Sequence, residues 1–475
     1  MRSTTILAAL SLAAQFSSGL ELNLDDQNSI KSAAKVAADG MMKWYTGNSA
    51  PGGIPGLLPG PYYWWEAGAM FGSLIDYWYY TGDDSYNADV TQALLFQVGP
   101  DDNYMPPNQS KSLGNDDQAF WGIAAMTAAE TNFPNPPADK PQWLALAQAV
   151  FQTQAVRWDD QTCGGGLKWQ IFTFNQGYNY KNAISNGCFF NLAARLGLYT
   201  QNATYLDWAD RTWDWMTAPG IAMLDDNYYV FDGTDDTMNC TELSHLQWSY
   251  NAGVFLYGAA IMWNVTEGDA RARWQERTQG LLDAAIKIFF KNQIMIEIAC
   301  EPSANCNIDQ QTFKAYLSRW MAASVKVAPW THDTIMPLIR ASATAAALSC
   351  TGGDDGQTCG TDWLNGTWDG GFGVGQQMNA LEVIQSNMID AVGGPLSNTT
   401  GGTSKGDYSA GTGYVAPKPL KVITTGDTVG AWILTFVVGS ALSLSLLWIA
   451  IDGPIGPAMS KGISPVKSLF GRFGS

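Results

Sequence analysis

The chain has 475 residues, of which 46% are hydrophobic and 12% are aromatic, including 20 Trp. This is enough apolar material for a large core, and it leaves aromatic rings to line a binding groove. The formal net charge of -17 repels the phosphates of nucleic acids and anionic lipid headgroups, so we expect no nucleic-acid partner.

The first segment, residues 1–19, has the pattern of a secretory signal peptide. Arg2 precedes an apolar run at 6–14, and the small residues at 17–19 resemble a cleavage site. We therefore expect the mature chain to begin near Leu20 and to enter the secretory pathway. Six Asn-X-Ser/Thr acceptors for N-glycosylation agree with that route; they are Asn108, Asn202, Asn239, Asn264, Asn365 and Asn398.

Residues 27 to 388 show helical periodicity interrupted by Gly, Pro, Asn and Asp, with few alternating strand patterns. Every second predicted helix is apolar on nearly all faces after a polar start, whereas the helices between them carry charge on one face. This alternation predicts an all-α domain at 20–395, an (α/α)6 barrel of six helical hairpins whose inner helices begin at one rim. The predicted helices are 27–45, 64–80, 85–98, 116–130, 142–158, 180–198, 203–216, 246–263, 270–292, 309–327, 334–349 and 373–388.

Residues 114–121, Gly-Asn-Asp-Asp-Gln-Ala-Phe-Trp, place two adjacent carboxylates at the start of a predicted inner helix. Glycosidic bond cleavage normally uses two carboxyl groups, and a retaining enzyme holds them about 5 to 5.5 Å apart. Neighbouring Cα atoms lie about 3.8 Å apart, and helical side chains diverge by about 100°, so that gap is reachable. We predict that Asp116 and Asp117 face the central cavity; helix capping by Asn115 or Asp116 is the structural alternative.

The polar starts of the other inner helices should share the same rim. Several carry aromatic residues, which as a group fit a sugar cleft, although core packing can explain any one of them. The predicted substrate-binding residues are Trp64, Trp65, Glu66, Asn115, Trp121, Lys181, Asn182, Asn186, Tyr250 and Asn251.

Seven cysteines lie between residues 163 and 359, and an oxidising secretory compartment favours disulfide formation. Short sequence separations favour two pairs, and a third pair would join two loops. Cys188 lies in an apolar helical pattern and is predicted to be a buried free thiol, although the sequence also allows it to pair with a loop cysteine. The predicted pairs are Cys163 with Cys240, Cys300 with Cys306 and Cys350 with Cys359.

The C-terminal region separates the barrel from a hydrophobic segment. Residues 396–429 are rich in Ser, Thr and Gly and are predicted to form a flexible stalk. Residues 430–451 follow as a hydrophobic span, long enough to cross a ~30 Å hydrocarbon core as a helix. A cleaved GPI-anchor signal, with attachment among residues 409–411, is the alternative, whereas the short basic tail at 452–475 favours a retained transmembrane helix. In either case we expect the barrel to be anchored at the outer surface of the plasma membrane.

Five motifs give the sequence a family resemblance: WWEAG at 64–68, GNDDQ at 114–118, CGGGLKW at 163–169, YKNAISNG at 180–187 and YNAG at 250–253. With them the chain resembles glycoside hydrolase family 76, the α-1,6-mannanases, and most closely its fungal, membrane-anchored cell-wall subgroup. The resemblance covers about residues 27 to 388. It implies an (α/α)6 barrel, no catalytic metal, and a retaining mechanism with Asp116 as nucleophile and Asp117 as general acid/base.

The resemblance also implies a substrate, because the fungal subgroup is thought to act on the mannose-containing core of GPI anchors and to move anchored proteins onto wall glucan. Hydrolysis and transfer to a glucan acceptor would use the same two Asp residues, so the sequence leaves both open. The alternative function is that of a non-catalytic surface protein that binds mannan or GPI glycan with the same barrel. Two adjacent acids argue against it, because their mutual repulsion would bring a mere lectin no evident benefit.

The sequence gives little evidence for a metal site. Only His245 and His332 are present, and neither has a partner at metal-ligand spacing. The acidic residues at 225–236 offer oxygen ligands for calcium, but they do not form an Asp-X-Asp-X-Asp-Gly loop. We therefore expect no metal and no cofactor.

Overall fold

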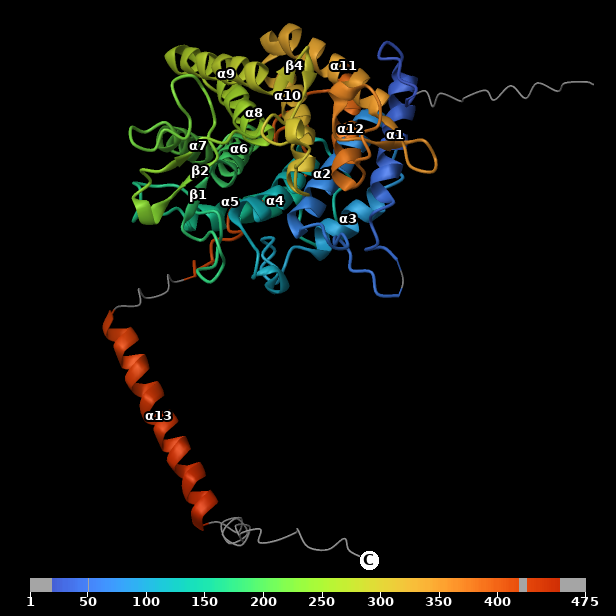
Figure 1. Ribbon diagram of the computed structural model, residues 1–475. Helices are drawn as coiled ribbons and strands as arrows, with labels where there is room; N and C mark the ends of the chain where they lie inside the picture. The colour runs from blue at the N-terminus through green and yellow to red at the C-terminus, as the bar shows by residue number, and fades with distance from the viewer. Residues whose placement is uncertain (1–18, 50, 418–424, 453–475) are drawn as a thin grey trace, which may run out of the picture. The chain divides into compact units, whose positions relative to one another are not determined.

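The computed structural model describes residues 19–49, 51–417 and 425–452 (Figure 1). The chain divides into two units, residues 1–417 and residues 418–475. The predicted signal peptide, apart from Gly19, and the basic tail, apart from Asp452, lie outside the described residues.

Six helices of the first unit form a closed inner ring, in which each helix contacts the next and the last returns to the first. Their residues are buried on almost every side; in the first of them only Trp78 and Tyr79 are not buried. Helices that are apolar all round need neighbours all round, and the ring provides them. The ring consists of α2 (Trp64–Thr81), α4 (Asn115–Glu130), α6 (Ala183–Thr200), α8 (Ser249–Val265), α10 (Phe313–Val327) and α12 (Val374–Gln385).

Six further helices pack around this ring. Helices α1 and α11 contact α12, while α3, α5, α7 and α9 contact α2, α4, α6 and α8 respectively. The predicted (α/α)6 barrel is therefore confirmed, and each predicted helix has a counterpart in the structure. The outer helices are α1 (Gln27–Met42), α3 (Asn87–Phe96), α5 (Trp143–Val156), α7 (Ala203–Met216), α9 (Gly268–Phe289) and α11 (His332–Ser349).

The predicted starts of three inner helices were too early; one of them, α10, begins at Phe313 instead of residue 309, because Gln310–Thr312 form a separate 3-10 turn. Tyr180–Asn182 form strand β1 of an antiparallel sheet, ordered β1-β2-β3, and α6 begins only at Ala183. The partner of β1 comes from far along the chain: β1 pairs with β2 (Gly233–Asp235), which in turn pairs with β3 (Leu243–Ser244). Helix α8 begins at Ser249 instead of residue 246. The pairing of β1 with the distant strand β2 leaves no trace in the local periodicity of the sequence.

The described residues also form two short hairpins: β4 (Phe290–Lys291) with β5 (Ile294–Met295), and β6 (Cys350–Gly352) with β7 (Thr358–Cys359).

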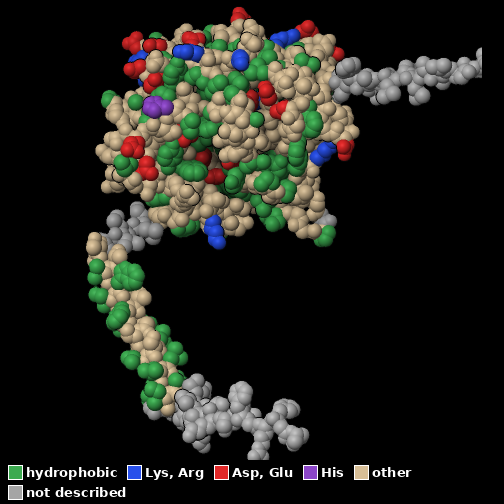
Figure 2. Space-filling view, in the orientation of Figure 1, with side chains coloured by type: hydrophobic (Ala, Val, Ile, Leu, Met, Phe, Trp, Pro, Cys, Tyr) green, Lys and Arg blue, Asp and Glu red, His purple; other side chains and the backbone are tan. Residues whose placement is uncertain are grey.

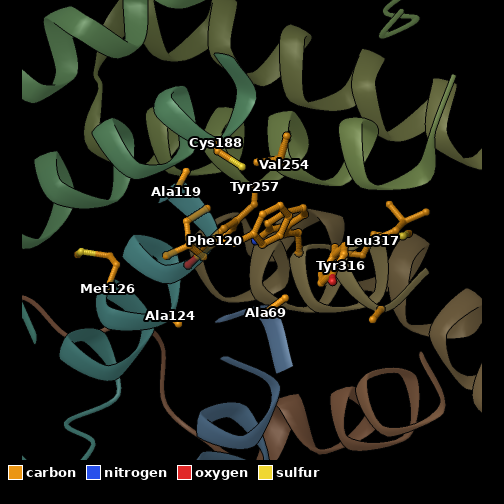
Figure 3. Close-up of a cluster of buried hydrophobic side chains, with 14 of the residues drawn as sticks. Ala69, Ala119, Phe120, Ala124, Met126, Cys188, Val254, Tyr257, Tyr316 and Leu317 are labelled. Carbon is orange, nitrogen blue, oxygen red and sulfur yellow. The ribbon is translucent and has the colours of Figure 1, made fainter. Parts of the chain in front are cut away.

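Aromatic side chains fill the middle of the ring. Figure 3 shows Ala69 of α2, Phe120 of α4, Cys188 of α6, Tyr257 of α8 and Tyr316 of α10 around this centre. The rings of Phe120 and Tyr316 have centroids 5.0 Å apart. The barrel is therefore packed through its middle, and any cavity must lie at its ends.

Buried ion pairs join the inner helices below this aromatic layer. Arg319 of α10 lies 2.9 Å from Asp76 of α2 and 2.6 Å from Glu382 of α12. Arg195 of α6 lies 2.6 Å from Glu130 of α4. Each ion pair joins two different inner helices, so these charges hold the ring together.

The three disulfides are Cys163–Cys240, Cys300–Cys306 and Cys350–Cys359. These are the pairs that sequence separation and loop position favoured. Cys188 is a free, buried thiol.

Residues 396–417 differ from the flexible stalk predicted at 396–429, because they pack along the outside of the barrel. The backbone N–H of Leu396 donates to the carbonyl of Glu130 (2.9 Å), and that of Asp407 donates to Gln148 Oε1 (2.7 Å). Several glycines here lie so close to the barrel that an added Cβ would clash with it. The same glycines that predicted a flexible stalk thus allow the backbone of this segment to lie close to the barrel. Residues 418–424 of the predicted stalk lie outside the described residues.

The second unit contains helix α13 (Thr425–Asp452), which includes the predicted hydrophobic span. Residues Thr425–Ile451 are long and apolar enough to cross a membrane, and none of this stretch is buried against protein. At 1.5 Å per residue the helix is about 40 Å long, which exceeds a ~30 Å hydrocarbon core.

The predicted glycosylation sites differ in their surroundings. Asn108, Asn239 and Asn365 are exposed. The Nδ2 atoms of Asn264 and Asn398 donate to backbone carbonyls at 2.8 and 3.3 Å, and Asn202 caps α7 through its side chain. A glycan on Asn264 or Asn398 would compete with these hydrogen bonds, whereas the three exposed side chains are accessible to attachment.

Candidate active site

A cavity of about 500 Å³ lies at the rim where the inner helices begin, and Asp116 and Asp117 are in its wall. In Figure 2, acidic side chains lie at the bottom of a hollow bordered by hydrophobic ones. The two acids belong to the first turn of α4. Both are therefore in the position that the sequence predicted.

Hydrogen bonds fix the start of α4. The N–H of Gly114 donates to Asp117 Oδ2 at 2.7 Å. Asn115 ties this turn to the neighbouring loop, because its N–H donates to the carbonyl of Trp169 (2.8 Å) and its Nδ2 donates to the carbonyl of Lys168 (2.8 Å). The carboxylates are thus carried by a backbone that is held from two sides.

The two carboxyl groups are close together. A Cβ atom built on Gly114 would lie 2.4 Å from Asp116 Oδ1 and 2.5 Å from Asp117 Oδ2. These two oxygens are consequently at most about 5 Å apart, which fits the separation in retaining glycosidases and is shorter than the ~6.5 to 9.5 Å of inverting ones. The arrangement suits attack by one carboxylate and proton transfer by the other on a single bond.

Burial and local hydrogen bonds give Asp116 and Asp117 different pKa values. The pKa of Asp117 is raised well above its usual range by burial and by the adjacent charge of Asp116. Burial also raises the pKa of Asp116, to about 7, but backbone N–H groups and the side chains of Asn182 and Ser185 favour its charged form. The pair therefore loses its first proton from Asp116 and keeps the second on Asp117. This is the order that a nucleophile and a general acid require.

Four of the predicted substrate-binding residues line the cavity: Trp64, Trp65, Asn182 and Tyr250. Tyr250 stacks on Phe313 with centroids 3.8 Å apart. The flat rings thus border the acids from the starts of α2, α8 and α10.

The other six predicted residues do not line the cavity, and their prediction as sugar contacts needs correction. Trp121 is fully buried and stacks beneath Trp64, with centroids 5.1 Å apart. Lys181 pairs with Asp159 at 3.2 Å on the far side of β1, because neighbouring residues of a strand face opposite ways. These residues support the wall from behind, as do Glu66, Asn115, Asn186 and Asn251.

Hydrogen bonds explain the positions of two of these supporting residues. Glu66 Oε2 accepts from the N–H of Tyr63 at 2.6 Å, which fixes the first turn of α2. Asn186 bonds both the N–H (2.8 Å) and the carbonyl (3.0 Å) of Leu167, which holds the glycine-rich loop. The polar groups of Glu66 and Asn186 thus form hydrogen bonds with the protein backbone.

Two further acids of the cavity wall, Asp232 and Asp309, were not predicted from the sequence. Asp309 accepts a hydrogen bond from Trp65 Nε1 (2.9 Å), and Asp232 accepts one from the hydroxyl of Tyr180 (2.7 Å). Burial raises the pKa of both. Asp309 could have been found, because it opens a predicted inner helix. Asp232 reaches the rim only through the β1–β2 pairing, for which the sequence holds no local signal.

Within the described residues, no cluster of three or more His, Cys, Asp or Glu side chains could hold a metal ion. His332 lies at the surface with its ring nitrogens near Asp333 and Asp390, and His245 packs against Phe231.

Comparison with known proteins places these features in context. A model of glycosyl hydrolase family 76 matches residues 29–399. Mannan endo-1,6-alpha-mannosidase DCW1 of Eremothecium gossypii is 49% identical over 450 residues, which cover 94% of this chain and 99% of the relative. The DCW1 protein of Saccharomyces cerevisiae is 46% identical over 445 residues, which cover 93% and 98%.

Two solved structures have a similar fold. The crystal structure of Dfg5 from Chaetomium thermophilum in complex with glucosamine has a TM-score of 0.79 and 47% identity, covering 82% of this chain and 97% of that one. An inactive variant of an α-1,6-mannanase from Salegentibacter, in complex with α-1,6-mannotriose, has a TM-score of 0.59 at 18% identity, covering 76% and 99%. The second likeness is one of fold.

Proposed function

The chain belongs to glycoside hydrolase family 76, and from this membership we propose that it is a retaining mannan endo-1,6-α-mannosidase of the fungal cell wall. The observation that carries the proposal is the pair Asp116 and Asp117, with oxygens at most about 5 Å apart in an aromatic cavity. Relatives that bear this activity in their names align over nearly their whole length.

The two acids would act by double displacement. Asp116, ionised, attacks the anomeric carbon while Asp117 gives its proton to the departing glycosidic oxygen, so that a mannosyl ester forms on Asp116. An incoming hydroxyl then attacks the same carbon, Asp117 takes its proton, and the ester bond breaks. Two inversions leave the anomeric configuration unchanged, and Asp117 is protonated again.

The remaining wall residues would position the sugar. Trp64, Trp65 and Tyr250 offer flat apolar faces to pyranose rings. Asp232 and Asp309 offer carboxyl oxygens to sugar hydroxyls, and such groups fix orientation in a pocket that is otherwise aromatic.

Retention of configuration gives a direct test. With a reduced α-1,6-mannan oligosaccharide, NMR should detect the α-anomer of the product first, before mutarotation. A first-formed β-anomer would refute the retaining mechanism. A folded protein that binds mannan but is not labelled at Asp116 by an activated fluoro-mannoside would favour the lectin alternative.

We also infer that a sugar hydroxyl of a glucan can replace water as acceptor, in keeping with a role in wall assembly on a GPI-core mannoside. Products formed from a synthetic GPI-core mannoside, with and without a β-glucan oligosaccharide, test this step. A mass equal to donor fragment plus glucan supports transfer, whereas free reducing mannose ends alone indicate hydrolysis.

We further infer that α13 anchors the barrel at the outer face of the plasma membrane. A retained transmembrane helix and a cleaved GPI signal are separable by mass spectrometry of the mature protein. Peptides from 430–451 support the helix. A lipid-bearing C-terminus among residues 409–411 supports the GPI anchor.

Replacing Gly114 with Ala should lower kcat by about a hundredfold or more, because a side chain there would displace both carboxyl groups. The backbone at Gly114 has φ -94°, which Ala adopts without strain, but the new Cβ would lie 3.0 Å from the carbonyl oxygen of Trp169, so the melting temperature should fall modestly. Steady-state kinetics and thermal unfolding check the two parts. Unchanged kcat would show that the acids tolerate displacement.

The pH dependence of kcat/KM should be bell-shaped. Activity rises as Asp116 loses its proton and falls as Asp117 loses its own. Because burial raises the pKa of Asp116 from 3.8 to about 7, we expect the acid limb near pH 7, with about a tenfold loss of kcat/KM for each pH unit below it. An acid limb near pH 4 would mean that Asp116 is not desolvated in the working enzyme.

A further inference from the structure

A second cavity, of about 450 Å³, lies between the end of α1 and the loop that precedes α12. Three aromatic residues line it: Trp44, Trp368 and Phe372. We call it the side pocket. Since α12 is an inner helix that begins at Val374, the side pocket is at the rim that carries the catalytic cavity.

Two neighbouring tyrosines connect the side pocket with the catalytic cavity. Tyr62 contacts Trp44 edge-to-face with centroids 6.0 Å apart, and its hydroxyl accepts a hydrogen bond from the N–H of Val374 at 3.0 Å. The next residue, Tyr63, lines the catalytic cavity. A chain bound in one cavity therefore has the other close by on the same face.

The aromatic residues of the side pocket are exposed and yet held in place. Trp368 and Phe372 are 36% and 62% exposed. Phe372 stacks on Trp44 at 6.0 Å, and Trp368 Nε1 donates to the carbonyl of Gly371. The carboxylate of Asp369 accepts from three backbone N–H groups of the same loop, and the Cys350–Cys359 disulfide anchors the residue at which this loop begins. Rigid exposed rings offer a stacking surface at low entropic cost.

A polar group in the wall lacks a partner. Gln377 lines the side pocket, is only 3% exposed, and its Oε1 accepts no hydrogen bond within the described structure. Buried side-chain oxygens are normally hydrogen-bonded, so an unsatisfied one that lines a cavity indicates a missing donor. A ligand hydroxyl would supply it.

The charges around the side pocket are already paired. Asp39 lies 2.5 Å from Lys35, and Lys43 lies 2.5 Å from Asp355. No net charge is left over to attract an ionic ligand, so the pocket favours a neutral one.

We propose that the side pocket is a second carbohydrate-binding site, which takes a neutral pyranose oligosaccharide outside the catalytic cavity. A sugar ring lies on Trp368 and Phe372, and one of its hydroxyls donates to Gln377 Oε1 once that amide, now buried against Gly40, turns toward the pocket. This inference extends the proposed function, because a second sugar site at the same rim would hold a distant part of the substrate or an acceptor chain. Binding there requires neither Asp116 nor Asp117.

The test uses the full chain in detergent with Asp116→Asn and Asp117→Asn, so that bound sugars are not turned over. Calorimetry with α-1,6-mannotetraose and with a β-1,3-linked glucohexaose measures binding. Trp368→Ala together with Phe372→Ala should weaken one of these sugars about tenfold or more, and Gln377→Leu should weaken it several-fold. Phe96→Ala is the matched control, because Phe96 is 58% exposed and lies outside the side pocket.

Which sugar responds identifies the source. Weaker mannotetraose binding assigns the side pocket to the substrate, and weaker glucohexaose binding assigns it to an acceptor. If neither sugar responds to the side-pocket variants, the proposal is wrong. Mannosidase activity, measured separately with Asp116 and Asp117 intact, reports on the proposed function, so the two ideas can fail independently.

Discussion

Replacing Asp116 with Asn is expected to lower the turnover of α-1,6-mannan by on the order of 10⁴-fold or more. The amide has nearly the shape of the carboxylate but cannot form the mannosyl ester. Its neutrality removes a buried charge, so the fold should remain intact or become slightly more stable. Turnover of mannan oligosaccharides and the melting temperature measure the two effects.

The matched variant Asp117→Asn separates the two roles. It should also fail on natural mannan, because the leaving oxygen finds no proton. With an activated mannoside, whose leaving group needs no proton, Asp117→Asn should still form the intermediate, whereas Asp116→Asn should not. Equal loss in both variants with the activated substrate would contradict the assignment of nucleophile and acid.

The second large effect concerns stability: Arg319→Met should lower the free energy of unfolding by about 3 to 5 kcal/mol. Arg319 neutralises Asp76 and Glu382 between three inner helices, and it also donates to Ser73 Oγ at 2.7 Å. Without it, two buried carboxylates of like charge remain unpaired. Chemical unfolding of the soluble barrel or of the full chain in detergent measures the change.

The defect should depend on pH. Burial raises the pKa of Asp76 to about 7, although Arg319 opposes that rise. A carboxyl group whose pKa is higher in the folded than in the unfolded chain binds more protons when folded, so its contribution to stability falls as pH increases from about 4 to 7. Loss of Arg319 should therefore destabilise more at pH 8 than at pH 5.

An exposed ion pair provides the control. Arg340 lies 2.6 Å from Asp25, with the two side chains 42% and 85% exposed. Arg340→Met should cost less than about 1 kcal/mol. If Arg319→Met lowers the free energy of unfolding no more than Arg340→Met does, the prediction is wrong. Water would then take the place of the guanidinium between the inner helices.

Sequence reasoning succeeded where one segment determines its own environment. The all-round apolar character of the inner helices predicted the barrel, and the polar start of one helix placed Asp116 and Asp117 at the rim. It failed where distant segments meet. Lys181 turned away from the cavity because residue 180 begins a strand whose partner lies some fifty residues later, and Asp232 entered the wall by the same pairing.

Composition misled in one further place. Ser, Thr and Gly at 396–417 read as a flexible stalk, yet the same small residues let the backbone pack against α5 and α6. Whether a glycine-rich segment is free or packed depends on the surface beside it, which its own sequence does not describe.

The Cys163–Cys240 disulfide joins the loop that carries Trp169 to the loop between β2 and β3, next to Asp232. The first loop contributes Trp169 to the catalytic wall, and the second loop is joined to Asp232 through the short strand β2, so this part of the wall is covalently braced only after oxidation. Thiols stay reduced in the cytosol and form disulfides in the secretory lumen. Under the export that we propose, the sugar site receives this brace in the oxidising compartment through which the chain passes.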